Sequence, residues 1–452
     1  VKITPHMRIH LIAIGGAVMH NLAIALHKKG HQVSGSDDEI FEPARSRLHN
    51  YNLLPAHMGW QPASISKSMD AVIIGMHARA DNPELLAALQ QHLPIFSFPE
   101  YIYKESENKK RIAVCGSHGK TTITSMIMHA LRFDNRDFDY LVGAQLQGFD
   151  TMVQLSDAPV IVLEGDEYFA SPLDRRPKFL HYKPQIAVLS GIAWDHYNVF
   201  PQWESYLEQF SQLLRAMGTD STLVYNAEDK NVVELVEQIK PACTLLPYYT
   251  SAYLLENEKT RIQYNQNSYT LNVFGKHNMQ NMEAAAAVAE MLNIPREKFY
   301  KSMETFKGAS RRLEVLYDAS GRTIFKDFAH SPSKVNATIN AVREQYPNRT
   351  LIACLELYTY SSLNKDFLPT YKNTMIHADV RIVYFNTHTL ELKKLPPILE
   401  TDIQKFFNDS QLLVFKDSDK LMHALLHYKK ENTCILLMSS GNFDNLNFDQ
   451  LV

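Results

Sequence analysis

The segment from Ala113 to Thr122 constrains the fold of this chain more than any other. It reads AVCGSHGKTT: a short apolar run, a turn with two glycines, and then Lys-Thr-Thr opening a helical stretch. Backbone N–H groups at such a helix start point at an anion, and the helix dipole favours negative charge there. The order of strand, glycine turn and helix therefore predicts a parallel α/β sheet that carries a phosphate-binding loop.

The residue types in this loop suit a nucleotide. Lys120 is placed to reach the β- and γ-phosphates, and the Thr121 hydroxyl to ligate Mg²⁺. The other loop residues are expected to surround the phosphates and are Gly116, Ser117, His118, Gly119 and Thr122. The general phosphate loop has a further glycine where this chain has Val114, so the loop is a shortened variant. The alternative is an ordinary turn before a helix.

Apolar runs alternate with helical stretches along all 452 residues. Parallel strands joined by crossover helices produce this alternation, so we expect an α/β fold. At roughly 150 residues per domain, the length suits about three domains. We place their boundaries at the charged segment 104–111, expected to be a linker, and near Lys307–Gly308. The expected domains are residues 1–106, 107–307 and 308–452.

Composition excludes several classes of protein. A net charge of −3 argues against a nucleic-acid binder, which needs clustered Lys and Arg. The four cysteines lie far apart with no CxxC pair, which argues against a zinc ribbon and a disulfide framework. No apolar run reaches about 18 residues, and the first residues resemble a strand rather than a signal peptide. We expect a cytoplasmic protein with neither nucleic-acid nor membrane partners.

A second glycine loop lies at the first expected strand–helix junction. It comprises Gly15, Gly16, Ala17, Val18 and Met19. Asp37 ends the second expected strand, near the roughly 20-residue offset of an acid that binds a ribose. Because the full GxGxxG pattern is absent, a glycine turn that only packs a helix is an equal alternative. His77 is a further candidate for this second nucleotide site.

Five further motifs follow the phosphate loop in a fixed order. They are EGDE at 164–167, WDH at 194–196, GKHNMQN at 275–281, SRRLE at 310–314 and DFAHSP at 327–332. Together with the loop they resemble the Mur ligase family, ATP-dependent enzymes that add amino acids or peptides to UDP-N-acetylmuramic acid. The resemblance spans essentially the whole chain.

The resemblance implies a complete plan for the molecule. The N-terminal domain would be Rossmann-like and would bind the UDP-sugar. The central domain would be a P-loop ATPase domain. The C-terminal domain would be Rossmann-like and would bind the peptide. ATP and Mg²⁺ would be the cofactors. The substrates would be UDP-N-acetylmuramate and a short peptide or L-alanine, joined through an acyl-phosphate. The protein would be a monomer or a weak homo-oligomer.

The same resemblance assigns roles in the central domain. Glu164 would ligate Mg²⁺ with Thr121, although a solvated acid at a strand end is the plain alternative. His196 would ligate a second Mg²⁺, although a lone histidine is more often structural. His277, Asn278 and Asn281 start a helix and would bind the adenine. The alternative for Asn278 is a helix N-cap.

In the third domain, Arg311 and Arg312 would offer an arginine to the γ-phosphate, or else form a solvated pair. Asp327 would bind the ribose hydroxyls, and His330 would lie near the phosphates or the substrate. The expected catalytic residues are therefore Lys120, Glu164, His196 and Arg312.

One segment points to a branch of the family. The stretch 166–184 resembles the enzymes that attach L-alanyl-γ-D-glutamyl-meso-diaminopimelate to UDP-N-acetylmuramate during peptidoglycan recycling. The similarity is carried by Asp174, Arg176, Lys178, Phe179, His181, Tyr182 and Pro184, with support from 436–443. The L-alanine ligase branch is the alternative. Ser331, where a second His is usual, and Tyr358, in a segment that usually carries an Arg, depart from the family pattern.

Two other classes of function remain open at this point. A nucleotide-dependent regulatory module would keep the phosphate loop but would need neither the second glycine loop nor the acid–histidine set. A dehydrogenase would use the loop at Gly15 with Asp37. Its glycine spacing is wrong, and no residues for hydride transfer stand out.

Overall fold

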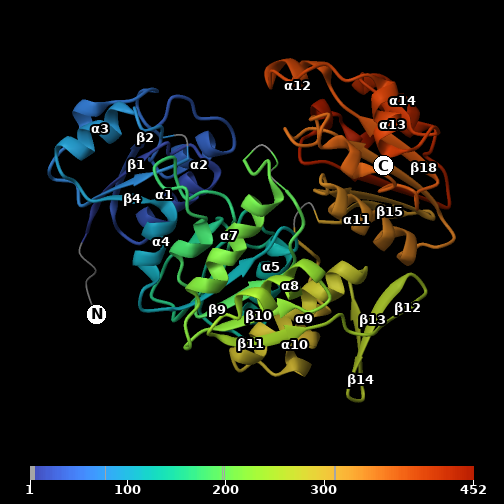
Figure 1. Ribbon diagram of the computed structural model, residues 1–452, viewed down its shortest axis with the longest axis horizontal. Coiled ribbons are helices and arrows are strands. Elements are labelled where there is room, and N and C mark those ends of the chain that lie inside the picture. Colours follow the sequence, from blue (N-terminus) through green and yellow to red (C-terminus); the bar gives the residue numbers. More distant parts are fainter. Residues whose placement is uncertain (1–5, 77, 196, 198, 310–311) are drawn as a thin grey trace.

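A computed structural model describes residues 6–76, 78–195, 197, 199–309 and 312–452. It consists of three α/β domains in sequence order, with the central domain between the other two (Figure 1). The predicted fold class is confirmed: each domain is built on a sheet that is mainly parallel. None of the helices in the described ranges is long and apolar enough to cross a membrane.

The N-terminal sheet has the order β2-β1-β3-β4, with all neighbours parallel. Its strands are β1 (Arg8–Ile12), β2 (Gln32–Ser36), β3 (Ala71–Ile74) and β4 (Ile95–Ser97). Its helices are α1 (Ala17–Lys28), α2 (Ala44–Asn50), α3 (Pro83–Gln90) and α4 (Phe98–Ser106). Helix α3 begins at Pro83, because the Asn82 side chain accepts from the Glu84 and Leu85 N–H groups.

The central sheet has the order β11-β10-β9-β5-β8-β6-β7, in which only β7 is antiparallel to its neighbour. Its strands are β5 (Lys110–Cys115), β6 (Asp139–Leu141), β7 (Val153–Gln154), β8 (Val160–Glu164), β9 (Ile186–Leu189), β10 (Thr222–Asn226) and β11 (Thr244–Tyr248). The helices are α5 (Lys120–Phe133), α6 (Lys178–His181), α7 (Trp203–Ala216), α8 (Lys230–Ile239), α9 (Lys276–Met291) and α10 (Arg296–Met303). Strand β5 lies between β9 and β8, which places its carboxyl end at the centre of the sheet edge.

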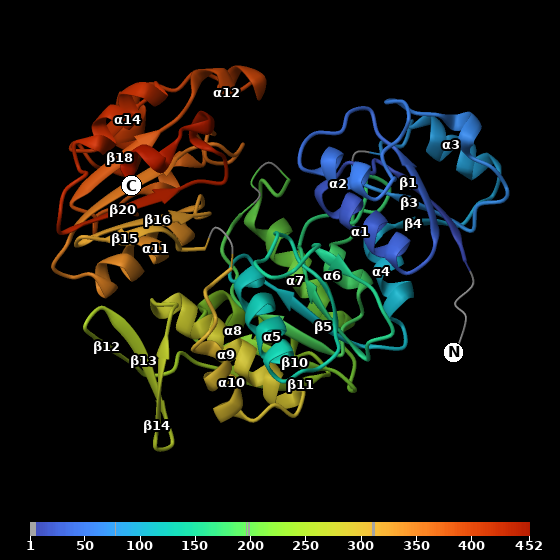
Figure 2. The same cartoon turned by 180° about the vertical axis from the view of Figure 1, so that it is seen from behind.

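A small antiparallel sheet, which the sequence analysis did not anticipate, follows β11. It consists of β12 (Tyr253–Glu256), β13 (Lys259–Tyr264) and β14 (Asn267–Leu271) and projects beside the third domain (Figure 2). The Tyr253 hydroxyl donates to Glu344 Oε1 at 2.7 Å, and Thr260 Oγ1 donates to Gln345 Oε1 at 3.0 Å. This sheet therefore connects the central domain to the third.

The third sheet has the order β15-β16-β20-β17-β18-β19, parallel except for β15. Its strands are β15 (Glu314–Ala319), β16 (Arg322–Asp327), β17 (Thr350–Glu356), β18 (Val380–Tyr384), β19 (Leu413–Phe415) and β20 (Thr433–Met438). The helices are α11 (Pro332–Gln345), α12 (Thr387–Leu392), α13 (Glu400–Phe407) and α14 (Ser418–Leu426). Strands β17 and β20 are almost wholly buried, as expected for a sheet covered by helices on both faces.

The charged segment 104–111 is not a free linker. Helix α4 continues to Ser106 and β5 begins at Lys110. Arg111 is 7% exposed, and its guanidinium donates to the carbonyl oxygens of Ser106 at 2.7 Å and Tyr182 at 2.9 Å. A run of charges is usually solvated, and nothing in the sequence marks Arg111 as buried. This side chain fixes the end of α4 against the segment before β9.

Arg111→Ala should therefore destabilise the protein. Its removal leaves buried carbonyl groups without donors, which costs about 2–4 kcal/mol. We expect scanning calorimetry to show a lower midpoint for the central domain, whereas Lys110→Ala, at the exposed neighbouring position, should leave it unchanged. Equal midpoints for the two variants would contradict this role.

Candidate active site

The phosphate loop has the geometry that its glycines predict. Gly116 has φ of +129° and Gly119 has φ of +77°, a region that favours glycine. A Cβ at Gly116 would lie 2.3 Å from Ser190 Oγ, and one at Gly119 would lie 2.4 Å from Asn281 Oδ1. No larger residue fits, so the loop turns tightly from β5 into α5. The first N–H groups of α5 therefore open onto the site.

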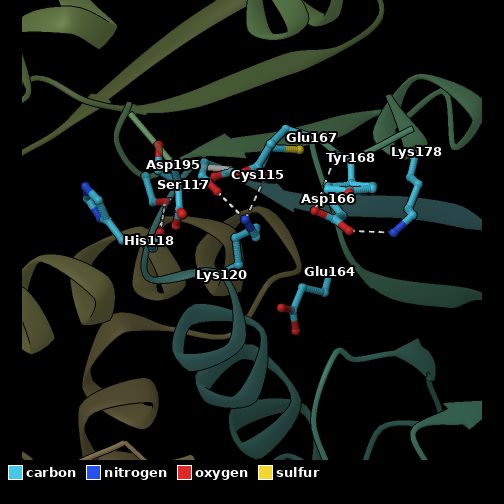
Figure 3. A network of polar contacts seen from close by, with 12 residues as sticks. Cys115, Ser117, His118, Lys120, Glu164, Asp166, Glu167, Tyr168, Lys178 and Asp195 are labelled. Atoms are coloured by element: carbon cyan, nitrogen blue, oxygen red, sulfur yellow. Dashed lines mark hydrogen bonds and ion pairs between the residues drawn. The ribbon is translucent and has the colours of Figure 1, made fainter. Parts of the chain in front are cut away.

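Lys120 is held across the loop by an ion pair. Its Nζ lies 2.7 Å from Glu167 Oε2 and donates to the Gly116 carbonyl at 2.6 Å (Figure 3). Glu167 is fully buried and also accepts from the Tyr206 hydroxyl at 2.8 Å. Burial opposes the charged form of Lys120, but the neighbouring carboxylates, Glu167 first, raise its pKa above the usual value. Lys120 therefore remains a cation at the phosphate loop.

Thr121 and Glu164 lie side by side, as the sequence predicted. Thr121 Oγ1 donates to Glu164 Oε1 at 2.9 Å, and the Gly143 N–H donates to Glu164 Oε2 at 2.8 Å. Glu164 ends β8, the strand next to β5. A hydroxyl and a carboxylate are hard oxygen ligands of the kind that Mg²⁺ prefers. This pair fits the first expected metal, while His196, the expected ligand of the second, lies outside the described residues.

A cavity of about 470 Å³ collects the candidate residues from all three domains. Every described residue of the expected ATP set except Gly116 lines it; Arg311 lies outside the described residues. The lining residues of that set are Ser117, His118, Gly119, Lys120, Thr121, Thr122, His277, Asn278, Asn281, Arg312, Asp327 and His330. Val18 and Phe98 add the N-terminal domain. The structure thus brings together residues that are more than two hundred positions apart.

Asn278 and Asn281 lie at the start of α9, on the face toward the phosphate loop. The N-cap of α9 is Gly275, so the alternative of an Asn278 cap is wrong. Asn278 instead donates to the Phe274 carbonyl at 2.9 Å. Asn281 packs against Gly119. This contact joins the predicted adenine residues to the loop.

The Asp327 carboxylate, expected to bind ribose hydroxyls, is bonded to backbone N–H groups of the third domain. Its carboxylate accepts from the Leu313 N–H at 2.7 Å and from the Ala329 N–H at 2.7 Å. These bonds fix the backbone next to Arg312, whose guanidinium lies 4.8 Å from the centre of the Phe328 ring. Asp327 is therefore a residue that positions the loop carrying Arg312 and His330.

Two half-buried histidines line the cavity, His118 from the central domain and His330 from the third. Burial, with a further contribution from the charge of Lys334, lowers the pKa of His118 and that of His330 to about 4. Both imidazoles are neutral near neutral pH.

An ion pair joins the third domain to the central one at this cavity. Lys334 Nζ, on α11, lies 2.8 Å from Oδ2 of Asp195, a residue that follows β9. Lys334 could not be predicted from the sequence, because no motif marks a pair that forms between two domains.

The N-terminal glycine loop is fixed by the acid that the sequence singled out. The Gly15 N–H donates to Asp37 Oδ2 at 2.8 Å, and burial raises the pKa of Asp37 to about 6. Gly16 precedes α1, and Met19 is buried within that helix. Of the expected set, Val18 reaches the cavity. His77 lies outside the described residues.

The two departures from the family pattern lie in the third domain. Ser331 is buried and is the N-cap residue of α11, although its side chain makes no capping bond. Tyr358, 37% exposed, follows β17, and Lys393 Nζ lies 5.0 Å from the centre of its ring. A cation from another part of the chain therefore lies beside the segment in which the family usually has an arginine.

Three models of the Mur ligase family match in order along the chain. They describe the family's catalytic domain at residues 8–109, the middle domain at 114–289 and the glutamate ligase domain at 311–441. Their order is the order in which the domains were expected from the motifs.

Individual relatives cover most of the chain. A UDP-N-acetylmuramate–L-alanine ligase from Clostridium tetani is 30% identical over 397 residues, 82% of this chain and 83% of that protein. A UDP-N-acetylmuramate–L-alanyl-γ-D-glutamyl-meso-2,6-diaminoheptandioate ligase from Haemophilus influenzae is 25% identical over 97% of each chain. The crystal structure of a murein peptide ligase from Psychrobacter arcticus has the same fold, with a TM-score of 0.66 at 22% identity over 98% of each chain. This chain belongs to the Mur ligase family, whose members are ATP-dependent ligases that form amide bonds.

Proposed function

We propose that the protein joins L-alanyl-γ-D-glutamyl-meso-diaminopimelate to UDP-N-acetylmuramate, with ATP converted to ADP and phosphate. The observation that carries a ligase function is the single cavity in which the phosphate loop meets residues of the other two domains. The peptide as acceptor is supported by segment 166–184 and by the name of the Haemophilus influenzae relative. Lys178 and Asp166 of that segment line the cavity itself.

Residues of the cavity would each contribute to a different part of the proposed amide-forming reaction. A carboxylate must be activated before an amine can attack it. Transfer of the γ-phosphate onto the carboxylate gives an acyl-phosphate, and the amine then attacks the acyl carbon and displaces phosphate. Phosphoryl transfer depends on positioning and on neutralising charge. Lys120 and the first N–H groups of α5 hold the phosphates, and Arg312 approaches from the third domain. A Mg²⁺ held by Thr121 and Glu164, and a second Mg²⁺ held by His196, would neutralise further phosphate charge.

Each substrate is assigned to a different domain. We assign the UDP-sugar to residues 1–106, through Gly15–Met19 and Asp37, and ATP to residues 107–307. His277, Asn278 and Asn281 surround the adenine, and Asp327 and His330 complete the pocket from residues 308–452. The tight Gly15–Asp37 contact supports a nucleotide site at the edge of the first sheet.

An L-alanine ligase is the second candidate, supported by the Clostridium tetani relative. It would use the same cavity with a smaller acceptor. A regulatory nucleotide switch has less support, because it does not need cavity residues from three domains. A dehydrogenase is excluded by the family to which the chain belongs.

Phosphate release measured with each acceptor tests this proposal. Release should require ATP, UDP-N-acetylmuramate and the tripeptide together, and L-alanine should support a rate at least roughly tenfold lower, as expected where the buried polar groups of a site remain unpaired. Preferential use of L-alanine would make the protein an alanine ligase. Release without either acceptor would favour the switch.

Glu164→Gln should lower turnover by about 10²–10³, because one preorganised charge at the phosphates is lost. The amide oxygen can still accept from the Gly143 N–H while the amide NH2 donates to Thr121 Oγ1, so the thermal midpoint should stay close to that of the wild type. Asp157→Asn, an exposed acid just before β8, is the matched control. Single-turnover phosphate release is the measurement, and wild-type release by Glu164→Gln would refute the metal-ligand role.

Affinity for UDP-N-acetylmuramate should fall as the pH falls through about 6. Burial raises the pKa of Asp37 to about that value, so the carboxylate that accepts from Gly15 becomes protonated below it. Losing a charged acceptor costs roughly tenfold in affinity. Titration calorimetry between about pH 5 and 8 should show this fall in the wild type, and Asp37→Asn should be uniformly weak. A pH profile that Asp37→Asn leaves unchanged would exclude this cause.

A further inference from the structure

Lys178 occupies a distinct place among the cations of the cavity. It is 14% exposed at its side chain, and its Nζ lies 2.6 Å from Asp166 Oδ2. The ammonium also lies 5.6 Å from the centre of the Phe98 ring, on α4 of the N-terminal domain. Figure 3 shows Lys178 on the opposite side of Glu164 from His118 and the phosphate loop. Lys178 therefore marks the end of the cavity next to the first domain.

The backbone holds Lys178 in this place. Its N–H donates to the Tyr168 carbonyl at 2.9 Å, and the Ala170 N–H donates to the Arg176 carbonyl at 2.9 Å. The chain from 166 to 178 thus closes on itself as a loop, and Lys178 opens α6. Within the loop, Arg176 donates to both carboxylate oxygens of Asp174. A side chain on so short a closed loop keeps a fixed position relative to Glu164.

The cavity holds several negative charges, so a substrate carboxylate that enters at this end needs a cation beside it. Glu164 and Asp166 line the cavity, and ATP adds further negative charge. The carboxylate that is to be phosphorylated must nevertheless approach the γ-phosphate. Lys120 is committed to the phosphate loop, and Arg312 and Lys334 come from the third domain. An ammonium has three hydrogens, so the bond to Asp166 leaves Lys178 with donors for a second anion.

We infer that Lys178 binds the carboxylate of the acyl donor, the group that receives the γ-phosphate. This inference rests on the proposed function, in which the UDP-sugar enters from the N-terminal domain. A sugar nucleotide held by that domain brings its lactyl carboxylate past Phe98 to Lys178, and Glu164 and the phosphate loop lie just beyond. Lys178 thereby selects a UDP-sugar that carries a carboxylate over one that lacks it.

Binding of two UDP-sugars without ATP tests this inference. UDP-N-acetylmuramate differs from UDP-N-acetylglucosamine by the lactyl group that bears the carboxylate. Because a charge-assisted hydrogen bond is lost without it, the wild type should prefer the first roughly 10- to 100-fold in titration calorimetry. Lys178→Gln should bring this ratio close to one while the affinity for UDP-N-acetylglucosamine stays unchanged. Lys178→Arg, which keeps the charge, should retain most of the preference.

Lys183→Gln is the matched control. Lys183 lies on the same segment, is exposed, and packs on the Tyr103 ring at 4.4 Å rather than lining the cavity. It should keep the wild-type ratio, and ADP affinity should be the same in all variants if the central domain is intact. A wild-type ratio in Lys178→Gln, or no preference in the wild type, would overturn the inference and leave the proposed function standing. A wild type that binds neither sugar would instead refute the proposed function.

Discussion

The active site depends on how negative charge is balanced at the carboxyl end of β8. Glu164, Asp166 and Glu167 follow one another within four residues, and each is turned to a different partner. Glu164 accepts from Thr121, Asp166 pairs with Lys178, and Glu167 pairs with Lys120. The parallel sheet makes this possible, because β5 and β8 are neighbours and end at the same edge. Acids and cations therefore lie close together at this edge of the sheet.

Contacts between the domains add to this balance of charge. Lys334 reaches Asp195 from the third domain, while Phe98 reaches Lys178 from the first. The rings of Tyr197 and Phe367 add an apolar contact between the central and third domains, with centres 5.6 Å apart. Under the proposed assignment, substrates that bind to different domains would meet in one small volume. Proximity of this kind supplies a large part of the rate enhancement in a reaction between bound partners.

The sequence predicted the parts of the molecule that have strong local signals. The apolar run before the phosphate loop is the buried part of β5, and the loop has glycines that its φ angles require. The β12–β14 sheet was missed because its residues are largely polar and exposed. The Lys334–Asp195 pair and the burial of Arg111 depend on contacts between distant segments. No local pattern encodes such contacts.

In the proposed reaction, a substrate carboxylate attacks the γ-phosphate in the cavity where the three domains meet. The transfer of oxygen from this carboxylate to phosphate can be followed with an isotope. UDP-N-acetylmuramate with ¹⁸O in its lactyl carboxylate should deliver one labelled oxygen to the phosphate released in each turnover, detected by mass spectrometry. Attack by water would leave the phosphate unlabelled. Unlabelled phosphate released together with amide product would contradict the acyl-phosphate route, and with it the proposed purpose of the site.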